Sequence, residues 1–161
     1  MAEIYLRDFT DGDLSLMSEW LMQPHVAIWF EHPQNWLAEI RNRHTDYHWI
    51  QHFIVMLAEQ PIGFCQYYDC YYANQLEDWY EVNQPGKVFS LDYLIGAEQF
   101  LKQGHGRQII AALIEKIAHL GAKKIIVAPE KENQASIAVL LVNGFQWDSV
   151  AQYFVLDLSV R

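Results

Sequence analysis

The chain has 161 residues, of which 52% are hydrophobic, 14% aromatic and 19% charged. This composition predicts a single domain, residues 1–161, and excludes a disordered chain, a collagen-like repeat and a mini-protein scaffold. Its 11 Lys and Arg against 20 Asp and Glu give a net charge of −9. Because nucleic-acid binding relies on basic surfaces, we expect no nucleic-acid partner and instead a cationic one.

Cysteines and apolar runs indicate the compartment. Cys65 and Cys70 lie in one strand-like run, where their odd separation places them on opposite faces, so we expect two buried thiols rather than a disulfide. No apolar run reaches the roughly 20 residues of a membrane helix, and the first residues form no signal core. We therefore expect a soluble, cytoplasmic protein without a membrane partner, and the oligomeric state stays open.

The first half of the chain mixes strand-like and helix-like patterns. In chain order it predicts a strand at 3–9, a helix at 12–22 that Asp11 caps and Pro24 stops, a helix from Pro33, strands at 52–59 and 62–72, and an acidic loop at 73–86. The short connection through Gln60 and Pro61 predicts that the two later strands form an antiparallel hairpin.

The second half predicts a strand, a glycine pair, a long helix and a second strand. In chain order the segments are a strand at 87–96, a helix ended by Gly121, a strand at 123–129, a helix at roughly 133–143 and a hairpin at 144–158. The apolar face of the long helix is expected at Ile109, Ile110, Leu113, Ile114, Ile117 and Leu120. This order predicts a parallel strand pair with a right-handed crossover, within a mixed α/β (α+β) sheet flanked by helices.

The glycine pair, Gly104 and Gly106, stands where a helix begins. Its backbone can approach a ligand closely, and the first helical N–H groups lack partners within the helix. With Lys102 and Arg107 nearby, the loop predicts an anion site suited to a pyrophosphate. A plain strand-to-helix turn is the alternative, because neither a Walker loop nor a dinucleotide fingerprint is present.

A second pattern follows at 128–145. Asn133, Ser136, Leu140 and Gly144-Phe145 occupy the spacings N-x-x-A-x-x-x-Y-x-x-x-G-F. With the glycine loop, this pattern resembles the GCN5-related N-acetyltransferase (GNAT) superfamily. The resemblance implies acetyl-CoA as acyl donor and a sheet whose parallel pair splays apart around the pantetheine arm.

The resemblance also assigns residues to the coenzyme. It implies contacts from Leu94, Ile95, Lys102, Gln103, Gly104, His105, Gly106, Arg107 and Asn133. Gly96 is consistent with a close backbone approach at that point. Two positions depart from the superfamily pattern: Leu101 stands where Gln or Arg is common, and Leu140 replaces the Tyr that often protonates the departing thiolate.

The front half narrows the resemblance to the aminoglycoside 6′-N-acetyltransferase branch. The segments 6–31 and 60–72, a Trp-rich acidic loop, and the run Ser90-Leu91-Asp92 resemble that branch. Such a resemblance implies a cationic small-molecule acceptor, an aminoglycoside with a 6′-amine, and antibiotic resistance. Other acceptors stay open: a polyamine, a protein amine or a siderophore precursor.

Asp92 is the predicted catalytic base. It is the one acid in an otherwise apolar strand, where a carboxylate is costly without a role or a partner. In the branch the matching Asp binds the acceptor amine and takes its proton; the alternative is a solvent-facing or Arg-paired Asp. The expected acceptor cleft consists of acids and aromatic rings at Trp29, Asp69, Tyr71, Glu77, Asp78, Trp79 and Asp92.

Other chemistries find no support in the sequence. The seven histidines show no metal-ligand motif, so no metal is expected, and no serine or cysteine stands in a nucleophile motif. We therefore expect direct attack by the amine in a ternary complex. A noncatalytic acyl-CoA-binding domain is the alternative from another class, and Leu140 in place of Tyr is its best support.

Overall fold

The computed structural model describes residues 3–76 and 82–159. Within them seven strands form one sheet in the order β1-β2-β3-β4-β5-β7-β6. The strands are β1 Ile4–Asp8, β2 Ile50–Leu57, β3 Gln60–Asp69, β4 Val88–Ile95, β5 Lys124–Val127, β6 Gln146–Asp148 and β7 Tyr153–Asp157. The helices are α1 Leu14–Leu21, α2 Pro24–Ala27, α3 Pro33–Arg41, α4 Cys70–Ala73, α5 His105–His119 and α6 Gln134–Val142. None of these helices is both long and apolar enough to cross a bilayer.

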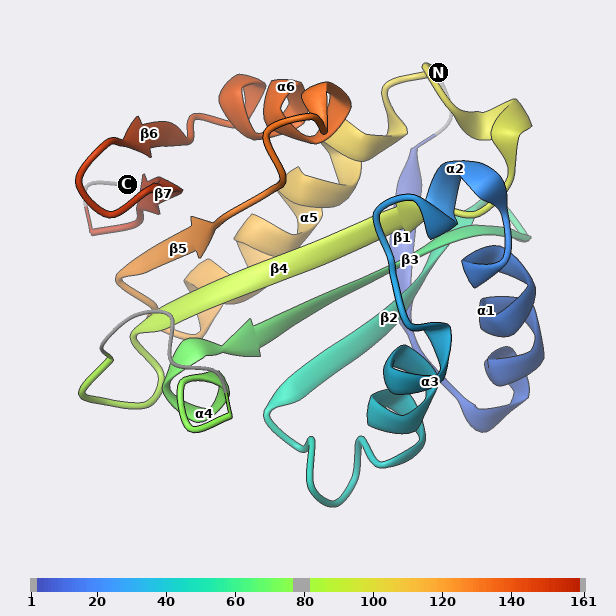
Figure 1. Ribbon diagram of the computed structural model, residues 1–161, viewed down its shortest axis with the longest axis horizontal. Coiled ribbons are helices and arrows are strands. Elements are labelled where there is room, and N and C mark those ends of the chain that lie inside the picture. The colour runs from blue at the N-terminus through green and yellow to red at the C-terminus, as the bar shows by residue number, and fades with distance from the viewer. Residues whose placement is uncertain (1–2, 77–81, 160–161) are drawn as a thin grey trace.

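The sheet separates two hydrophobic clusters, and helices cover both of its faces (Figure 1). Helix α5 packs on one face, where Ile109, Leu113 and Ile117 are fully buried. Helices α1 and α3 cover the other face with Met17 and Ile40. Successive side chains of a strand point to opposite faces, so β4 contributes Leu91 to the first cluster and Leu94 to the second.

The sheet confirms the predicted fold class. All neighbouring strands pair antiparallel except β4 and β5, which pair in parallel only at Val88–Lys124 and Phe89–Ile125. Beyond Phe89 the two strands diverge, and a cleft lined by residues of β4 and of the segment after β5 lies between them. The expected splay of the parallel pair is therefore present.

The start of the first helix differs from the prediction that Asp11 caps it. Thr10 is the capping residue of a 3-10 turn over Asp11–Asp13 that leads into α1, and its backbone N–H and hydroxyl donate to Asp13. Arg7 binds the same carboxylate through both terminal nitrogens at 2.8 Å, and this pairing lowers the pKa of Asp13. Asp11 instead forms an ion pair with Arg43.

Two further boundaries correct the sequence interpretation. The strand predicted over 62–72 ends at Asp69, and Cys70 begins α4, so the two cysteines do not share a strand. Both are nonetheless free and buried, and burial raises the pKa of the Cys65 thiol. Leu120, expected in the core, is 53% exposed, because α5 ends at His119 and turns through Gly121 in the left-handed region.

Candidate active site

Three adjoining cavities lie along the sheet between α3 and the start of α5. An acceptor cavity of about 570 Å³ lies under α3, a junction cavity of about 280 Å³ lies between the splayed strands, and a glycine-loop cavity of about 400 Å³ lies at the start of α5. Asp92 lines both the first and the second cavity. Tyr93, Asn133 and Ser136 line both the second and the third. The three cavities therefore adjoin one another, and Asp92 lies where the first and the second meet.

The glycine-loop cavity has the geometry of an anion site. Gly104, at φ 84°, adopts the left-handed conformation that glycine accepts without strain, and α5 begins at the next residue. The first N–H groups of a helix have no partner within it, and the helix dipole adds partial positive charge there. Lys102 and Arg107 line the same cavity. The residues present fit a phosphate-bearing ligand.

Of the remaining residues expected to bind the coenzyme, His105 and Asn133 line the glycine-loop cavity and Gln103 does not. His105 lines the glycine-loop cavity with its ring buried near Phe100. Gln103 is exposed, and its amide donates to the Gln99 carbonyl. Asn133 lines the cavity and caps α6, because its Oδ1 accepts the N–H of Ser136 at 3.2 Å.

Leu94 and Ile95, near the end of β4, line the glycine-loop cavity. Gly96 donates its N–H to Ile62 of β3, whereas the Ile95 carbonyl accepts from His25 Nε2 at 2.8 Å. Because backbone groups alternate between the two edges of a strand, the Ile95 amide faces the open side. The same alternation turns the Leu94 amide towards β3, so of the two expected donors only Ile95 presents its N–H on the open side of β4.

Two glycines near β4 are explained by side chains rather than by a ligand. A Cβ at residue 96 would overlap the indole ring of Trp20, so α1 supplies the close approach that the sequence suggested for the pantetheine arm. A Cβ at residue 106 would lie 3.1 Å from the Tyr93 hydroxyl. Tyr93 thus packs on the first turn of α5, and burial raises the pKa of its phenol to about 12.

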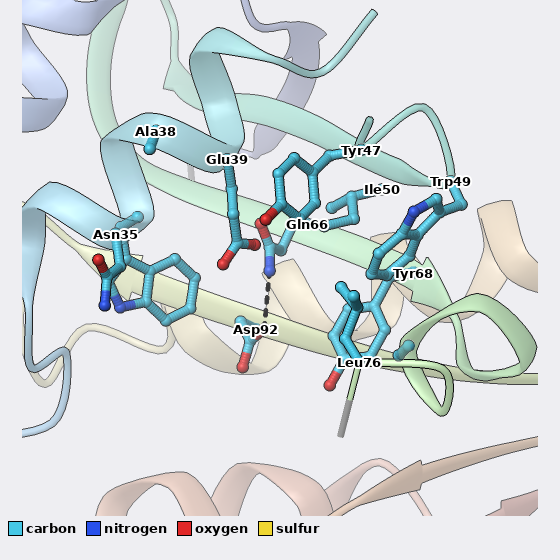
Figure 2. A pocket seen from close by; sticks show the side chains of 12 residues that line it. Asn35, Ala38, Glu39, Tyr47, Trp49, Ile50, Gln66, Tyr68, Leu76 and Asp92 are labelled. Atoms are coloured by element: carbon cyan, nitrogen blue, oxygen red, sulfur yellow. Dashed lines mark hydrogen bonds between the residues drawn. The ribbon is translucent and has the colours of Figure 1, made fainter. Parts of the chain in front are cut away.

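The acceptor cavity is lined by polar and aromatic side chains around Asp92 (Figure 2). Gln66, directly across from Asp92 on β3, donates its Nε2 to Asp92 Oδ2 at 2.9 Å. Gln66 is 3% exposed, so this hydrogen bond is shielded from water. The aromatic lining comes from Trp36, Tyr47, Trp49 and Tyr68. Gln66 therefore holds Asp92 in the wall of a cavity that also presents aromatic rings.

The expected acceptor residues only partly meet at this cavity. Trp29 lines the junction and glycine-loop cavities. Asp69 is turned to the backbone, because its two carboxylate oxygens accept the N–H groups of Tyr71 and Gly86. Tyr71 packs edge-on against Tyr72 and is not among the lining residues. The other expected residues, Glu77, Asp78 and Trp79, lie outside the described residues.

Several residues of the site were missed from the sequence. Gln66 carries a usable signal, as a lone amide between apolar strand residues. Glu39 and Trp36 carry none, because only the docking of α3 over the sheet turns them towards Asp92. Across residues 3–76 and 82–159, no group of three or more His, Cys, Asp or Glu side chains is placed to hold a metal ion.

Comparison with known proteins identifies the family. The pattern of the acetyltransferase (GNAT) domain family matches residues 10–152. This match includes the splayed strands β4 and β5, the glycine loop and Asp92, and it spans most of the chain. The chain therefore belongs to the GNAT acetyltransferase family. Leu140, one of the two positions at which the sequence departs from the expected pattern, is buried and lines the junction cavity.

Individual relatives of the chain have more specific names than the family. The chain is 27% identical over 150 residues to an aminoglycoside N(6′)-acetyltransferase type 1 from Klebsiella pneumoniae, covering 89% of this chain and 74% of that protein. A crystal structure of aminoglycoside acetyltransferase AAC(6′)-Ib with coenzyme A and kanamycin has a TM-score of 0.81 at 25% identity, covering 96% of this chain and 95% of that one. An aminoglycoside N(6′)-acetyltransferase from Legionella pneumophila shares the fold at a TM-score of 0.75 and 17% identity, covering 99% and 95%. The chain is thus an N-acetyltransferase related to enzymes of this kind.

Proposed function

We propose that this protein transfers the acetyl group of acetyl-CoA to the 6′-amine of aminoglycosides and so confers resistance to them. The observation that carries the proposal is the place of Asp92. It lines both the acceptor cavity, with its polar and aromatic walls, and the junction cavity that adjoins the glycine-loop cavity. The names of the chain's relatives, and the structure of one of them with coenzyme A and kanamycin, support the choice of donor and acceptor.

The chain's own residues account for donor binding. The amides at the start of α5, with Lys102 and Arg107, bind the pyrophosphate, and the Ile95 N–H on the open edge of β4 binds the donor's carbonyl. When bound, acetyl-CoA supplies an acetyl group activated as a thioester. Holding the amine and this group together at the junction cavity removes much of the entropic barrier to their reaction.

Asp92 binds and deprotonates the acceptor amine. Its carboxylate pairs with the ammonium form and accepts one proton, which leaves the neutral amine that attacks. Gln66 fixes the carboxylate by donating to Oδ2, so the carboxylate is oriented before the acceptor arrives.

The departing thiolate does not require an acid from the protein. Leu140 offers no hydroxyl, and Tyr93, which lines the same cavity, has a pKa raised to about 12. A thiol has a pKa of about 8.5, so proton transfer from Tyr93 to a thiolate is unfavourable. Tyr93 therefore serves as a hydrogen-bond donor, and the released thiolate is protonated by equilibration with the solvent, because a thiol with a pKa of about 8.5 is mostly protonated at neutral pH.

Replacing Asp92 by Asn tests the proposal against a noncatalytic acyl-CoA-binding domain. We expect kcat/KM for acetylation of kanamycin to fall by about 100-fold or more, because the base is lost. Calorimetric affinity for coenzyme A should not change, since the glycine-loop cavity is intact. The control is Asp8→Asn, an exposed aspartate on β1. Full activity in Asp92→Asn would contradict the assignment of the base.

A further inference from the structure

The end of β4 is held from three sides. On one side, the Gly96 N–H donates to the Ile62 carbonyl of β3 at 2.8 Å. At the open edge, His25 of α2, which lies beside the end of β4 in Figure 1, donates from Nε2 to the Ile95 carbonyl at 2.8 Å. On the face of the sheet, the Trp20 indole fills the space where a Cβ of residue 96 would lie. Both polar atoms of the peptide between residues 95 and 96 are therefore bonded within the protein.

This arrangement leaves Ile95 with a single kind of backbone group to offer a ligand. The N–H and the carbonyl of one strand residue point to the same edge, so the Ile95 N–H lies on the side from which His25 approaches the carbonyl. An unpaired strand edge offers both donors and acceptors. Because His25 occupies the acceptor, a ligand that reaches Ile95 meets a donor alone. A donor is what the carbonyl of a thioester requires as negative charge develops on its oxygen.

The hydrogen bonding of His25 does not by itself favour the folded state. A carbonyl oxygen only accepts hydrogen bonds, so Nε2 carries the proton and Nδ1 of the neutral ring is an acceptor. Nδ1 is buried and has no hydrogen-bond partner in the part of the chain that the structure describes. On average a neutral hydrogen bond gains less than an unpaired buried acceptor costs. Stability alone would therefore favour an apolar side chain at this position, and the histidine requires another explanation.

We infer that His25 is a positioning residue for the donor's thioester: its bond to the Ile95 carbonyl fixes this residue so that the Ile95 N–H points at the thioester oxygen. The inference rests on the proposed function, in which this N–H binds the donor's carbonyl. His25 lines the glycine-loop cavity and is not among the described residues that line the acceptor cavity. It therefore acts on the donor rather than on the amine, and it exchanges no proton with either reactant.

Three substitutions separate the two ring nitrogens. His25→Leu removes both, His25→Gln places an amide N–H near the position of Nε2, and His25→Asn reaches only as far as Nδ1. With neamine, an aminoglycoside that has a 6′-amine, we expect kcat to fall about 10- to 100-fold in His25→Leu and His25→Asn, because a misaligned donor stabilises the oxyanion less. His25→Gln should recover most of this loss. KM for neamine, and the calorimetric affinity for coenzyme A, which has no acetyl group, should stay at the wild-type level. The exposed change His119→Gln on α5 is the control.

Infrared difference spectra of bound acetyl-CoA, isotopically labelled at the thioester carbonyl, need no acceptor and no turnover. The carbonyl stretch should lie lower in wild type and His25→Gln than in His25→Leu, because a hydrogen bond weakens the C=O bond. Equal frequencies in all three proteins, or a kcat that His25→Asn restores and His25→Gln does not, would overturn the role of His25. So would a loss of kcat matched by a lower melting temperature and weaker coenzyme A binding, since that pattern is structural. The frequency difference in a wild-type protein that acetylates no aminoglycoside would support His25 and refute the proposed function.

Discussion

His52 should make the stability of the fold depend on pH. It is buried on β2, and neither ring nitrogen has a hydrogen-bond partner among the described residues. Burial, with the nearby charges of Arg43 and His44, lowers the pKa of His52 from 6.5 to about 4. As the pH falls through 6.5, the unfolded chain binds a proton that the folded chain does not. Stability therefore declines from that point, and the contribution is fully lost below about pH 4.

The size of the effect follows from the two pKa values. The interval from 6.5 to about 4 corresponds to about 3 kcal/mol of unfolding free energy, of which about 2 kcal/mol is lost between about pH 7 and pH 5. His52→Leu removes the titrating group. We expect wild type to lose about 2 kcal/mol more than this variant over the same pH interval.

Urea unfolding followed by tryptophan fluorescence at both pH values measures this difference. His119→Gln, an exposed change on α5, is the matched control and should follow wild type. Equal pH dependence in wild type and His52→Leu would refute the reasoning, because the buried imidazole would then not be the group that takes up the proton.

Two further substitutions test the site and the packing around it. Gln66→Met removes the donor to Asp92 and should lower kcat/KM about tenfold at unchanged coenzyme A affinity, with a shift in the pH–rate profile; an unaltered profile would count against the positioning role. Gly96→Ala forces a Cβ into the Trp20 indole and should destabilise the fold by about 2 kcal/mol or more in thermal melts. The control is Gly12→Ala, whose added Cβ would make only an ordinary van der Waals contact with Thr10. Equal melting points for Gly96→Ala and Gly12→Ala would contradict the packing argument.

Local pattern was enough to predict most of the fold. The apolar face of α5, the glycine before it and Asn133 before α6 each depend on short-range physics, so their spacing is visible in one chain. The cap of the first helix was misplaced although its pattern is local. Thr10 and Asp13 form a capping box, whose T-x-x-D spacing is visible in the sequence, so Thr10 rather than Asp11 caps the first turn.

The candidate site likewise contains residues that the sequence points to and residues that it does not. Asp92 was predictable because an acid in an apolar strand is exceptional in itself. Glu39 and Trp36 were not, since their relevance depends on how α3 docks over β3, which brings residues far apart in sequence to one cavity. Asp69 shows the opposite error: it belongs to the acidic run, yet its carboxylate is used to hold the backbone of Tyr71 and Gly86.

The most direct test compares neamine with paromamine, which differ only in having an amine or a hydroxyl at the 6′ position. Thiol release from acetyl-CoA by the wild-type protein is measured with each, and the product is analysed for the acetylated nitrogen. We predict turnover with neamine, acetylation at its 6′-nitrogen, and none with paromamine. Equal turnover with both sugars, or none with either despite measurable coenzyme A binding, would contradict the proposed function.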